Sequence, residues 1–495
     1  MAYTVYQMTH DVIEGIVDLA EGLGLEAAEH VVGVVTDVIQ LAAFGAGAEI
    51  GSAFKLKLSP LVEGMKPVKL PDGKQTLWHP DLAPYEQKNL TLTSDSKPDE
   101  HGLHQHAEQK LLPLDDKLYF VDKASTEPTS RTHRIKHPTR PNAYSPTLEH
   151  NGRGAWVHEA ENPVDWEGET LMRRLGHSVD RFSSTELEQI RISSGTQADA
   201  LRRLHVDSAP PPPVLADTIK RFSAYDDARI ASSNIREGRS IEPSSVWFEP
   251  MMTSLPGWPS ERALKVFEKA GLTGTSRQYG NANATPANTL SMSLADVTSG
   301  QLPDKVLAFL DETEIKALLG HDVPSAERVK VLRDLLAQAV DGRRAAISKR
   351  LYQASETSSK ADVRLLRQAS PDLPLTLADA VLADAKADER KIMDDENRLP
   401  LRLKTQAREL NFEAASARAY DGFYRDEQVV PDTERLALRT LNTYADSFAE
   451  MRIEVRDGTH DGELRCGEGP EDASTIRRLI RDEHGQYEVL GGDNK

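Results

Sequence analysis

The sequence predicts an α+β fold that is mostly helical, and three observations support this prediction. Residues 324–425 carry apolar side chains at helical spacing almost throughout. Residues 60–167 instead contain many prolines and glycines between short runs of alternating polarity, which is typical of strands. Two later phrases, "SLPGWPSERALKVFEKAG" and "TLNTYADSFAEMRIEVRDG", resemble each other weakly, and each contains a predicted strand. We therefore expect an N-terminal αα-hairpin, a small antiparallel β-sheet, a helical middle, and two weakly repeated strand-plus-helix units.

These elements divide the chain into six expected segments. In chain order they are a helical hairpin (1–59), a β-rich domain (60–167), a helical segment with a polyproline elbow (168–246), a first α+β repeat unit (247–330), a helical domain (331–430) and a second α+β repeat unit (431–495). The helices that follow the first repeat have no counterpart after the second. We therefore expect the second unit to be truncated and the chain to be a fragment of a longer polypeptide.

The N-terminal pair of helices, residues 9–57, has two interpretations. Its most apolar window spans residues 31–51 and is interrupted by Asp37, Glu49 and several glycines. A clear transmembrane helix needs about 20 apolar residues with few or no charges, so packing inside protein is favoured. Membrane contact, with the window as one arm of an inserting hairpin, remains the alternative.

The β-rich segment is predicted to form an antiparallel sheet of four to six strands. Asp72-Gly73 is a strong signal for a tight hairpin turn. An antiparallel sheet of this kind buries one face and leaves the other in water. The residues expected on the buried face are Leu118, Phe120, Ile135, Leu148 and Trp156.

The four prolines in "SAPPPPVLADTIKRF" are interpreted as a structural corner. Proline is favoured at the first position of a helix, and the residue before a proline is displaced from the helical region. The preceding helix should therefore end by Ser208 or Ala209, and the next should begin within the prolines. A docking motif for a proline-binding domain and a stiff linker between domains are the two weaker interpretations.

Apolar residues indicate which faces of the later helices are buried. In the first repeat, Ser293 is the expected N-cap of a helix. One expected buried face comprises Leu332, Leu335, Leu336 and Ala339. Parts of another comprise Leu399, Leu401, Leu403, Leu410, Phe412 and Tyr420.

Composition excludes several classes of function. The chain has 495 residues, of which 39% are hydrophobic and 28% charged, as in a polar globular protein with several domains. Its formal net charge of −18 argues against nucleic-acid binding, because phosphates are neutralised by lysine and arginine. Cys466 is the only cysteine, so neither an internal disulfide nor a CxxC zinc site can form. The first residues lack a basic segment followed by a long apolar one, so we expect no signal peptide.

One cluster has the residue types of a metal site. Asp99, Glu100, His101, His104 and His106 lie within eight residues, and imidazole and carboxylate groups bind zinc and other divalent ions. In a strand, His104 and His106 share one face. The helical HExxH arrangement is absent, and no second group of ligands stands out. Solvated histidines of a strand and turn are the favoured interpretation, and a metal-dependent enzyme is the alternative.

No other motif assigns a catalytic role. Cys466 lies beside Arg465, and a helix beginning near Glu471 would stabilise a thiolate, but packing at the end of a strand is favoured. The acidic pairs Asp226-Asp227 and Asp394-Asp395 are expected on solvated faces. The tryptophans are expected to be core anchors. Phosphate-binding loops of the GxxxxGK[ST] type and the GxSxG nucleophile motif are absent. We therefore assign no catalytic residue, no metal ligand and no cofactor.

Several phrases resemble a known family, the large bacterial toxin and effector proteins with a dermonecrotic-toxin N-terminal-type region. The phrases are "LWHPDLAPY", "IKHPTRPNAYSPTLEHNGRGAWVHE", "ETLMRRLG", "ELEQIRISSGTQADALRRLHVDSAPPPPVLADTIKRF", "SLPGWPSERALKVFE" and "ARAYDGFY". The resemblance extends from about residue 9 to the end of the chain. The phrase around the prolines is its most specific part.

The resemblance implies a function without providing a catalytic residue. Many proteins of this family continue into leucine-rich repeats and a novel-type (NEL) E3 ubiquitin ligase domain with a catalytic cysteine in a Cys-x-Asp setting. Here no such repeat is visible, and Cys466 stands in "CGE". The expectation is a non-catalytic scaffold or targeting region of a bacterial toxin or effector, secreted into a host cell by a non-classical route. Its expected partners are a host protein or other modules of the same polypeptide. The alternatives are part of a ligase effector and a membrane-active toxin segment.

Overall fold

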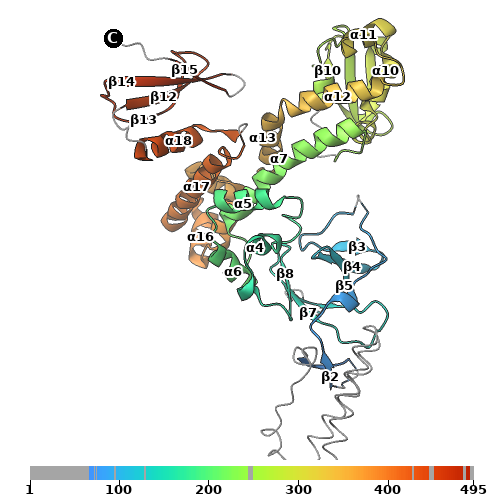
Figure 1. The fold of residues 1–495 in the computed structure, drawn as a ribbon, viewed down its shortest axis with the longest axis vertical. Helices are drawn as coiled ribbons and strands as arrows, with labels where there is room; N and C mark the ends of the chain where they lie inside the picture. The colour runs from blue at the N-terminus through green and yellow to red at the C-terminus, as the bar shows by residue number, and fades with distance from the viewer. Residues whose placement is uncertain are drawn as a thin grey trace, which may run out of the picture. The chain divides into compact units, whose positions relative to one another are not determined.

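The computed structural model in Figure 1 confirms the mostly helical α+β fold class. It describes residues 66–490 except 72, 74, 94–95, 128–129, 243–248, 426–427, 445–450 and 483–485. The predicted hairpin of residues 9–57 lies outside the described residues. The chain divides into two compact units, and the division passes between Pro211 and Pro212. Unit 1 comprises residues up to Leu187 together with 197–211, and unit 2 comprises residues 188–196 together with 212–495.

Unit 1 is built on a six-stranded antiparallel sheet in which each strand pairs with the next along the chain. The strands are β3 (His104–His106), β4 (Gln109–Leu114), β5 (Lys117–Lys123), β6 (Thr132–Ile135), β7 (Thr147–His150) and β8 (Trp156–His158). A separate hairpin precedes the sheet and consists of β1 (Lys66–Lys69) and β2 (Gln75–Trp78). Its turn contains Gly73 at φ +88°, a left-handed conformation that glycine adopts without strain. The hairpin agrees with the prediction, but the described part of this segment has eight strands in two sheets and not four to six in one.

The buried face of the sheet differs from the prediction at one strand. Ile135, Leu148 and Trp156 are buried as expected, but in β5 the buried residues are Tyr119 and Val121. Leu118 and Phe120, which were expected inside, point to the other face and are half-buried. Because side chains alternate along a strand, a change of one residue in register exchanges the two faces. Aromatic and apolar residues occupy both faces of β5, so its pattern alone does not fix the register.

Short helices complete unit 1 and lead to the prolines. They are η2 (Ala83–Tyr85), η3 (Pro163–Asp165), α4 (Glu169–Arg173) and α6 (Ala198–Val206), while α5 (Ser184–Ser193) crosses the division between the units. Helix α6 ends at Val206, before the limit set by the prolines. Pro213 is the first residue of α7 (Pro213–Glu237), so the helix begins within the proline tract as predicted.

Unit 2 is organised around α7, beside which α12 and α13 run (Figure 1). Its other helices are α8 (Glu249–Met252), η5 (Pro286–Asn288), α9 (Leu294–Thr298), α10 (Leu302–Phe309), α11 (Glu312–Leu319), α12 (Arg328–Asp341), α13 (Arg344–Ser355), α14 (Ala361–Ala369), α15 (Leu375–Ala383), α16 (Ala387–Glu396), α17 (Leu401–Asp421) and α18 (Pro431–Tyr444). Ser293 caps α9 in a capping box with Asp296, as predicted. Among the described residues, no helix is long and apolar enough to cross a membrane.

The helical faces are only partly as predicted. Leu332 and Leu336 of α12 and Leu403 of α17 are fully buried. Leu401 and Phe412 were also expected inside, yet they are 78% and 75% exposed. Helix α17 packs its small residues inward at 407, 414, 417 and 419, and this places its larger apolar side chains on the outer face. The spacing therefore predicts the helix but not its orientation.

The two repeated phrases form sheets with the same connectivity. In the first copy, β9 (Ala263–Lys269) pairs antiparallel with β10 (Thr273–Gly280) and parallel with β11 (Thr289–Ser293). In the second, β12 (Met451–Asp457) pairs antiparallel with β13 (Leu464–Glu468) and parallel with β14 (Thr475–Arg481), and β15 (Tyr487–Leu490) adds to β14. Each copy also has a buried glutamate on the preceding helix that accepts a hydrogen bond from a sheet tyrosine. The pairs are Glu249 with Tyr279 and Glu434 with Tyr487.

Candidate functional site

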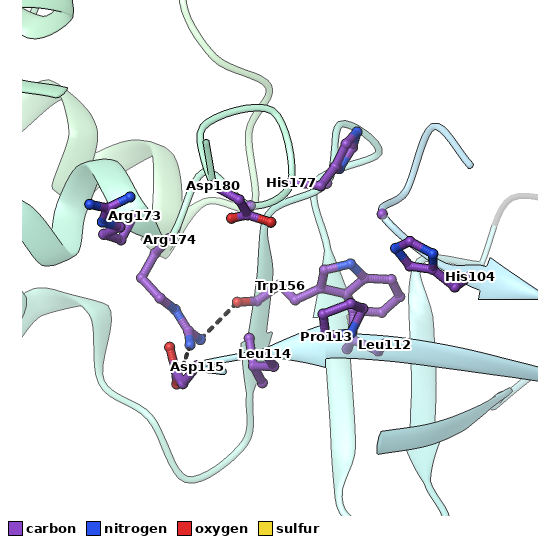
Figure 2. A pocket seen from close by; sticks show the side chains of 13 residues that line it. His104, Leu112, Pro113, Leu114, Asp115, Trp156, Arg173, Arg174, His177 and Asp180 are labelled. Carbon is purple, nitrogen blue, oxygen red and sulfur yellow. Dashed lines mark hydrogen bonds and ion pairs between the residues drawn. The ribbon is translucent and has the colours of Figure 1, made fainter. Parts of the chain in front are cut away.

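A small pocket in unit 1 brings together histidine, aspartate and arginine side chains (Figure 2). It lies where β3, β4 and β8 meet the loop that follows α4. Figure 2 shows the Trp156 indole at its centre, with His104 near one end of the ring and the Asp180 carboxylate near the other. The cavity has a volume of about 70 Å³.

The pocket exists because the two edge strands of the sheet approach each other. Trp156 of β8 donates its indole N–H to the carbonyl of His101, just before β3, at 2.7 Å. Arg174 makes a second connection, donating to the Asp115 carboxylate and to the Trp156 carbonyl, each at 2.9 Å. The sheet is therefore strongly curved. Arg174, which is 6% exposed, connects the two ends of the sheet.

Two glycines, Gly102 and Gly154, make room for His177 at the edge of the pocket, and a third, Gly176, lets the loop approach the Gly154 backbone. Gly102, Gly154 and Gly176 all have φ between +81° and +97°, where other residues are strained. A Cβ atom on Gly154 would lie 2.5 Å from His177 Nδ1, and one on Gly176 would lie 1.9 Å from the Gly154 carbonyl oxygen. The ring can therefore pack directly against bare backbone.

Burial shifts the pKa values of the titratable groups that line the pocket. It lowers the pKa of His104 and of His177, and it raises the pKa of Asp180. His104 is further held by a 2.8 Å hydrogen bond between its Nδ1 and the Ser96 hydroxyl. The two imidazoles are therefore neutral near pH 7, because removal from water disfavours the imidazolium ion.

Three more histidines stack around Trp156. The His101 and His150 ring centroids are 4.5 Å apart, and His150 lies 4.8 Å from the indole. His133 packs edge-on against the same indole at 5.0 Å. Burial lowers the pKa of His133, and it lowers that of His150 to about 4. His133 and His150 are therefore packing elements that carry no charge at neutral pH.

The size of the pocket limits its chemistry. Sites for small organic ligands usually enclose about 300–1,000 Å³, whereas this volume holds a few water molecules. Within residues 66–490, leaving out the gaps given above, no group of three histidine, cysteine, aspartate or glutamate side chains has the geometry to hold a metal ion. The geometry therefore favours a structural role in closing the sheet.

The residues proposed from sequence as metal ligands point in different directions. The Asp99 carboxylate accepts hydrogen bonds from the backbone N–H groups of His101 and Leu103 and forms an ion pair with Lys110. It therefore fixes the turn before β3. His104 is buried and lines the pocket, whereas His106 is exposed at the other end of the strand. The expected solvated cluster is thus partly wrong, because His104 is inside.

Cys466 is buried in the middle of β13, opposite Val455 of β12. Its Sγ lies 4.0 Å from the Glu434 carboxylate, and burial together with this negative charge raises the thiol pKa to about 11. Arg465 is the cation next to Cys466 in the chain. It donates a hydrogen bond to Glu434 at 2.9 Å, and the thiol pKa remains raised despite its charge. The expected helix near Glu471 is also absent, because a turn there leads into β14.

The acidic pairs and the tryptophans are only partly placed as the sequence predicts. Asp394 and Asp395 are exposed on α16, as expected. Asp226 was expected on a solvated face, but it is 2% exposed and pairs with Arg229. Trp78 and Trp156 are core residues. Trp247 lies outside the described residues.

Sequence reasoning missed most of the pocket. His177 and Asp180 follow α4 in "LGHSVD", more than 50 residues after His104 and Leu112 along the chain. The one local signal is the glycine beside each pocket loop, at positions 102, 154 and 176. A glycine indicates a turn, but it does not indicate which ring will pack against it.

Comparison with known proteins adds no relative. A scan of protein-family models finds no match to this chain, and searches of curated proteins and of solved structures find none either.

Proposed function

We propose that this chain is a non-catalytic scaffold or targeting region of a bacterial toxin or effector-type protein. It acts through contacts with a host protein or with other modules of the same polypeptide. The proposal is supported by the resemblance of its phrases to the dermonecrotic-toxin N-terminal-type region. The observation that carries it is the environment of Cys466.

A cysteine that forms a thioester must be available as a thiolate. Nucleophilic cysteines have pKa values lowered by a nearby cation or a helix N-terminus and are accessible to a second protein. Cys466 is 3% exposed, faces the Glu434 carboxylate and has a pKa of about 11. Each of these three features disfavours ubiquitin transfer through this residue.

A ubiquitin-discharge assay tests the proposal. The full chain is mixed with a ubiquitin-charged carrier enzyme, with a NEL-type ligase as the positive control. We expect no discharge above the rate in buffer, and the same result for Cys466→Ala. Discharge by the unmodified chain that is lost in Cys466→Ala would overturn the proposal and support the ligase alternative.

A second candidate function is acid-dependent membrane activity led by residues 9–57. The buried neutral histidines of unit 1 favour it, because such histidines destabilise a fold as the pH falls below their unfolded pKa. Leakage of dye from liposomes with anionic lipid, measured at pH 7 and pH 5, tests this function. Leakage at pH 5 alone supports it, and no leakage at either pH eliminates it.

A further inference from the structure

Unit 2 contains a cavity of about 730 Å³, which lies within the usual range for small-molecule sites. Its walls come from α7, α13, α17, the α14–α15 loop and the segment before α18. It thus differs from the histidine pocket of unit 1 in position and by tenfold in size.

The floor of the cavity is a network of buried charges. Arg221 of α7 is held by two aspartates: Asp217 on the same helix, and Asp421 of α17, whose Oδ2 accepts from Arg221 Nε at 2.7 Å. Tyr352 of α13 donates its hydroxyl to Asp217 Oδ1 at 2.7 Å. Two carboxylates and one guanidinium leave a formal charge of −1. The second oxygen of Asp421, Oδ1, is buried and has no partner among the described residues.

The wall of the cavity carries cations that are not paired in this way. Arg418 of α17 and Lys349 of α13 both line the cavity, and the structure records no hydrogen bond or ion pair for either within its described part. Arg367 is different, because it donates to the Glu356 carboxylate and to the carbonyls of Leu373 and Glu356. Burial raises the pKa of Asp217, and the positive charges of Arg221 and Arg418 oppose this shift, so Arg418 also compensates the charge of the floor. Among the described residues, Arg418 and Lys349 are the two lining cations that no recorded hydrogen bond or ion pair holds.

The rest of the wall mixes apolar side chains with polar ones, and the polar ones include Ser348, Gln353, Asp372 and Gln428. Leu373 and Pro374 contribute from the α14–α15 loop, Ala345 from α13, and Val429 and Val430 from the segment before α18. A bound molecule would therefore meet apolar surface beside the two cations. The planar guanidinium of arginine can donate two parallel hydrogen bonds to one carboxylate or phosphate group. A site that contains such an arginine therefore prefers anions.

We propose that this cavity binds a small organic anion, a carboxylate or phosphate ester on an apolar body, through Arg418 and Lys349. The anionic group pairs with the two cations, and the body contacts the apolar wall. This inference is independent of the proposed function, since a scaffold with or without catalytic activity can carry the site.

Titration calorimetry with four probes on the full chain tests the inference. The probes are 1-naphthyl phosphate, 1-naphthoate, uncharged 1-naphthol and inorganic phosphate. We expect the first two to bind at least about tenfold more tightly than the last two, because only they combine an anion with an apolar body. The tighter of the two anions identifies the preferred anionic group. Binding of 1-naphthol as tight as that of both anions, or binding of none of the probes, would overturn the inference.

Variants locate the site. Arg418→Gln and Lys349→Gln should each weaken the tighter naphthyl anion by about tenfold, which corresponds to loss of one charge-assisted contact. Arg408→Gln is the matched control, because Arg408 is an exposed residue of the same helix as Arg418 and does not line the cavity. Circular dichroism checks that each variant is folded. Lys349 is exposed, so Lys349→Gln should remain folded. Its affinity for the anion tests the inference even if Arg418→Gln misfolds. Equal affinity in all three variants contradicts the inference.

Discussion

Two sites, one in each compact unit, bury titratable side chains in different ways. Around Trp156, unit 1 buries histidines as neutral rings, and Nδ1 of His133 and of His177 has no hydrogen-bond partner among the described residues. Unit 2 instead buries charged groups together, with Arg221 between Asp217 and Asp421. Both arrangements answer the same problem, because an isolated charge is costly to remove from water.

The difference shows how each unit depends on its surroundings. A neutral ring needs no partner, but it resists protonation and so becomes unfavourable in acid. A paired network tolerates acid better but depends on every member, since removing one partner leaves an uncompensated charge. Unit 1 should therefore respond to pH and unit 2 to substitution.

The largest expected effect is the loss of the cation in unit 2. Arg221→Met leaves Asp217 and Asp421 buried without their common partner. We expect unit 2 to lose about 3–5 kcal/mol of stability. Hydrogen–deuterium exchange resolved by peptide measures this loss in each unit separately. Arg236→Met is the control on the same helix, because the Arg236 side chain is 46% exposed and its pairing contributes at most about 1 kcal/mol.

The second prediction is that mild acid destabilises unit 1 selectively. Burial lowers the pKa of His150 and of His158 to about 4, below the ordinary value of 6.5. Their contribution is therefore fully present above pH 6.5 and is lost as the pH falls from 6.5 toward 4. At pH 5 each histidine should cost about 2 kcal/mol.

Unit 2 provides the contrast in the same experiment. Hydrogen bonds from Arg402 lower the pKa of Glu389 to about 2, so its contribution is lost only as the pH falls from about 4.5 toward 2. Exchange at pH 5, corrected for its intrinsic pH dependence, should therefore accelerate in unit 1 alone. His133→Phe should reduce the acid response, whereas substitution of the exposed His106 by Gln should leave it unchanged. Equal acceleration in both units would refute the contrast.

The third prediction concerns the packing of unit 1. Gly176→Ala places a methyl group against the Gly154 carbonyl at a positive φ, and we expect a loss of roughly 2–3 kcal/mol. Gly152→Ala is a matched control, because its φ is +78° but no atom lies within 4 Å of the added Cβ. The control should cost about 1 kcal/mol from backbone strain alone. Denaturant-dependent exchange compares them, and equal losses would show that the close approach of Gly176 to the Gly154 carbonyl contributes nothing.

The smallest expected effect lies outside both buried sites. Phe412 is 75% exposed on α17, so Phe412→Ser should change the stability of unit 2 by less than about 0.5 kcal/mol. The fully buried Leu403 on the same helix is the positive control, since Leu403→Ala should cost about 2–5 kcal/mol. Thermal unfolding monitored by circular dichroism checks both. A large loss for Phe412→Ser would show that the outer face of α17 is covered in solution.

Local patterns were sufficient for much of the fold. The hairpin around Gly73, the cap at Ser293 and the helix start at Pro213 each follow from one residue type and its immediate neighbours. The weak repeat also led to two sheets of the same connectivity. Patterns were insufficient wherever both faces of an element carry apolar side chains, as in β5 and α17. There, only the neighbouring elements decide which face is buried.

The sequence by itself determined the order and type of most elements, because capping, proline stereochemistry and side-chain periodicity act within a few residues. Tertiary structure alone decided the two polar sites. His104 and His177 line one pocket because the loop after α4 packs against the glycines that precede β3 and β8. Arg221 meets Asp421 across 200 residues because α7 packs against α17. The raised pKa of Cys466 was decided in the same way, by burial and by the charge of Glu434 from a neighbouring helix. Burial and charge pairing are properties of the folded environment, so no sequence motif in the chain predicts them.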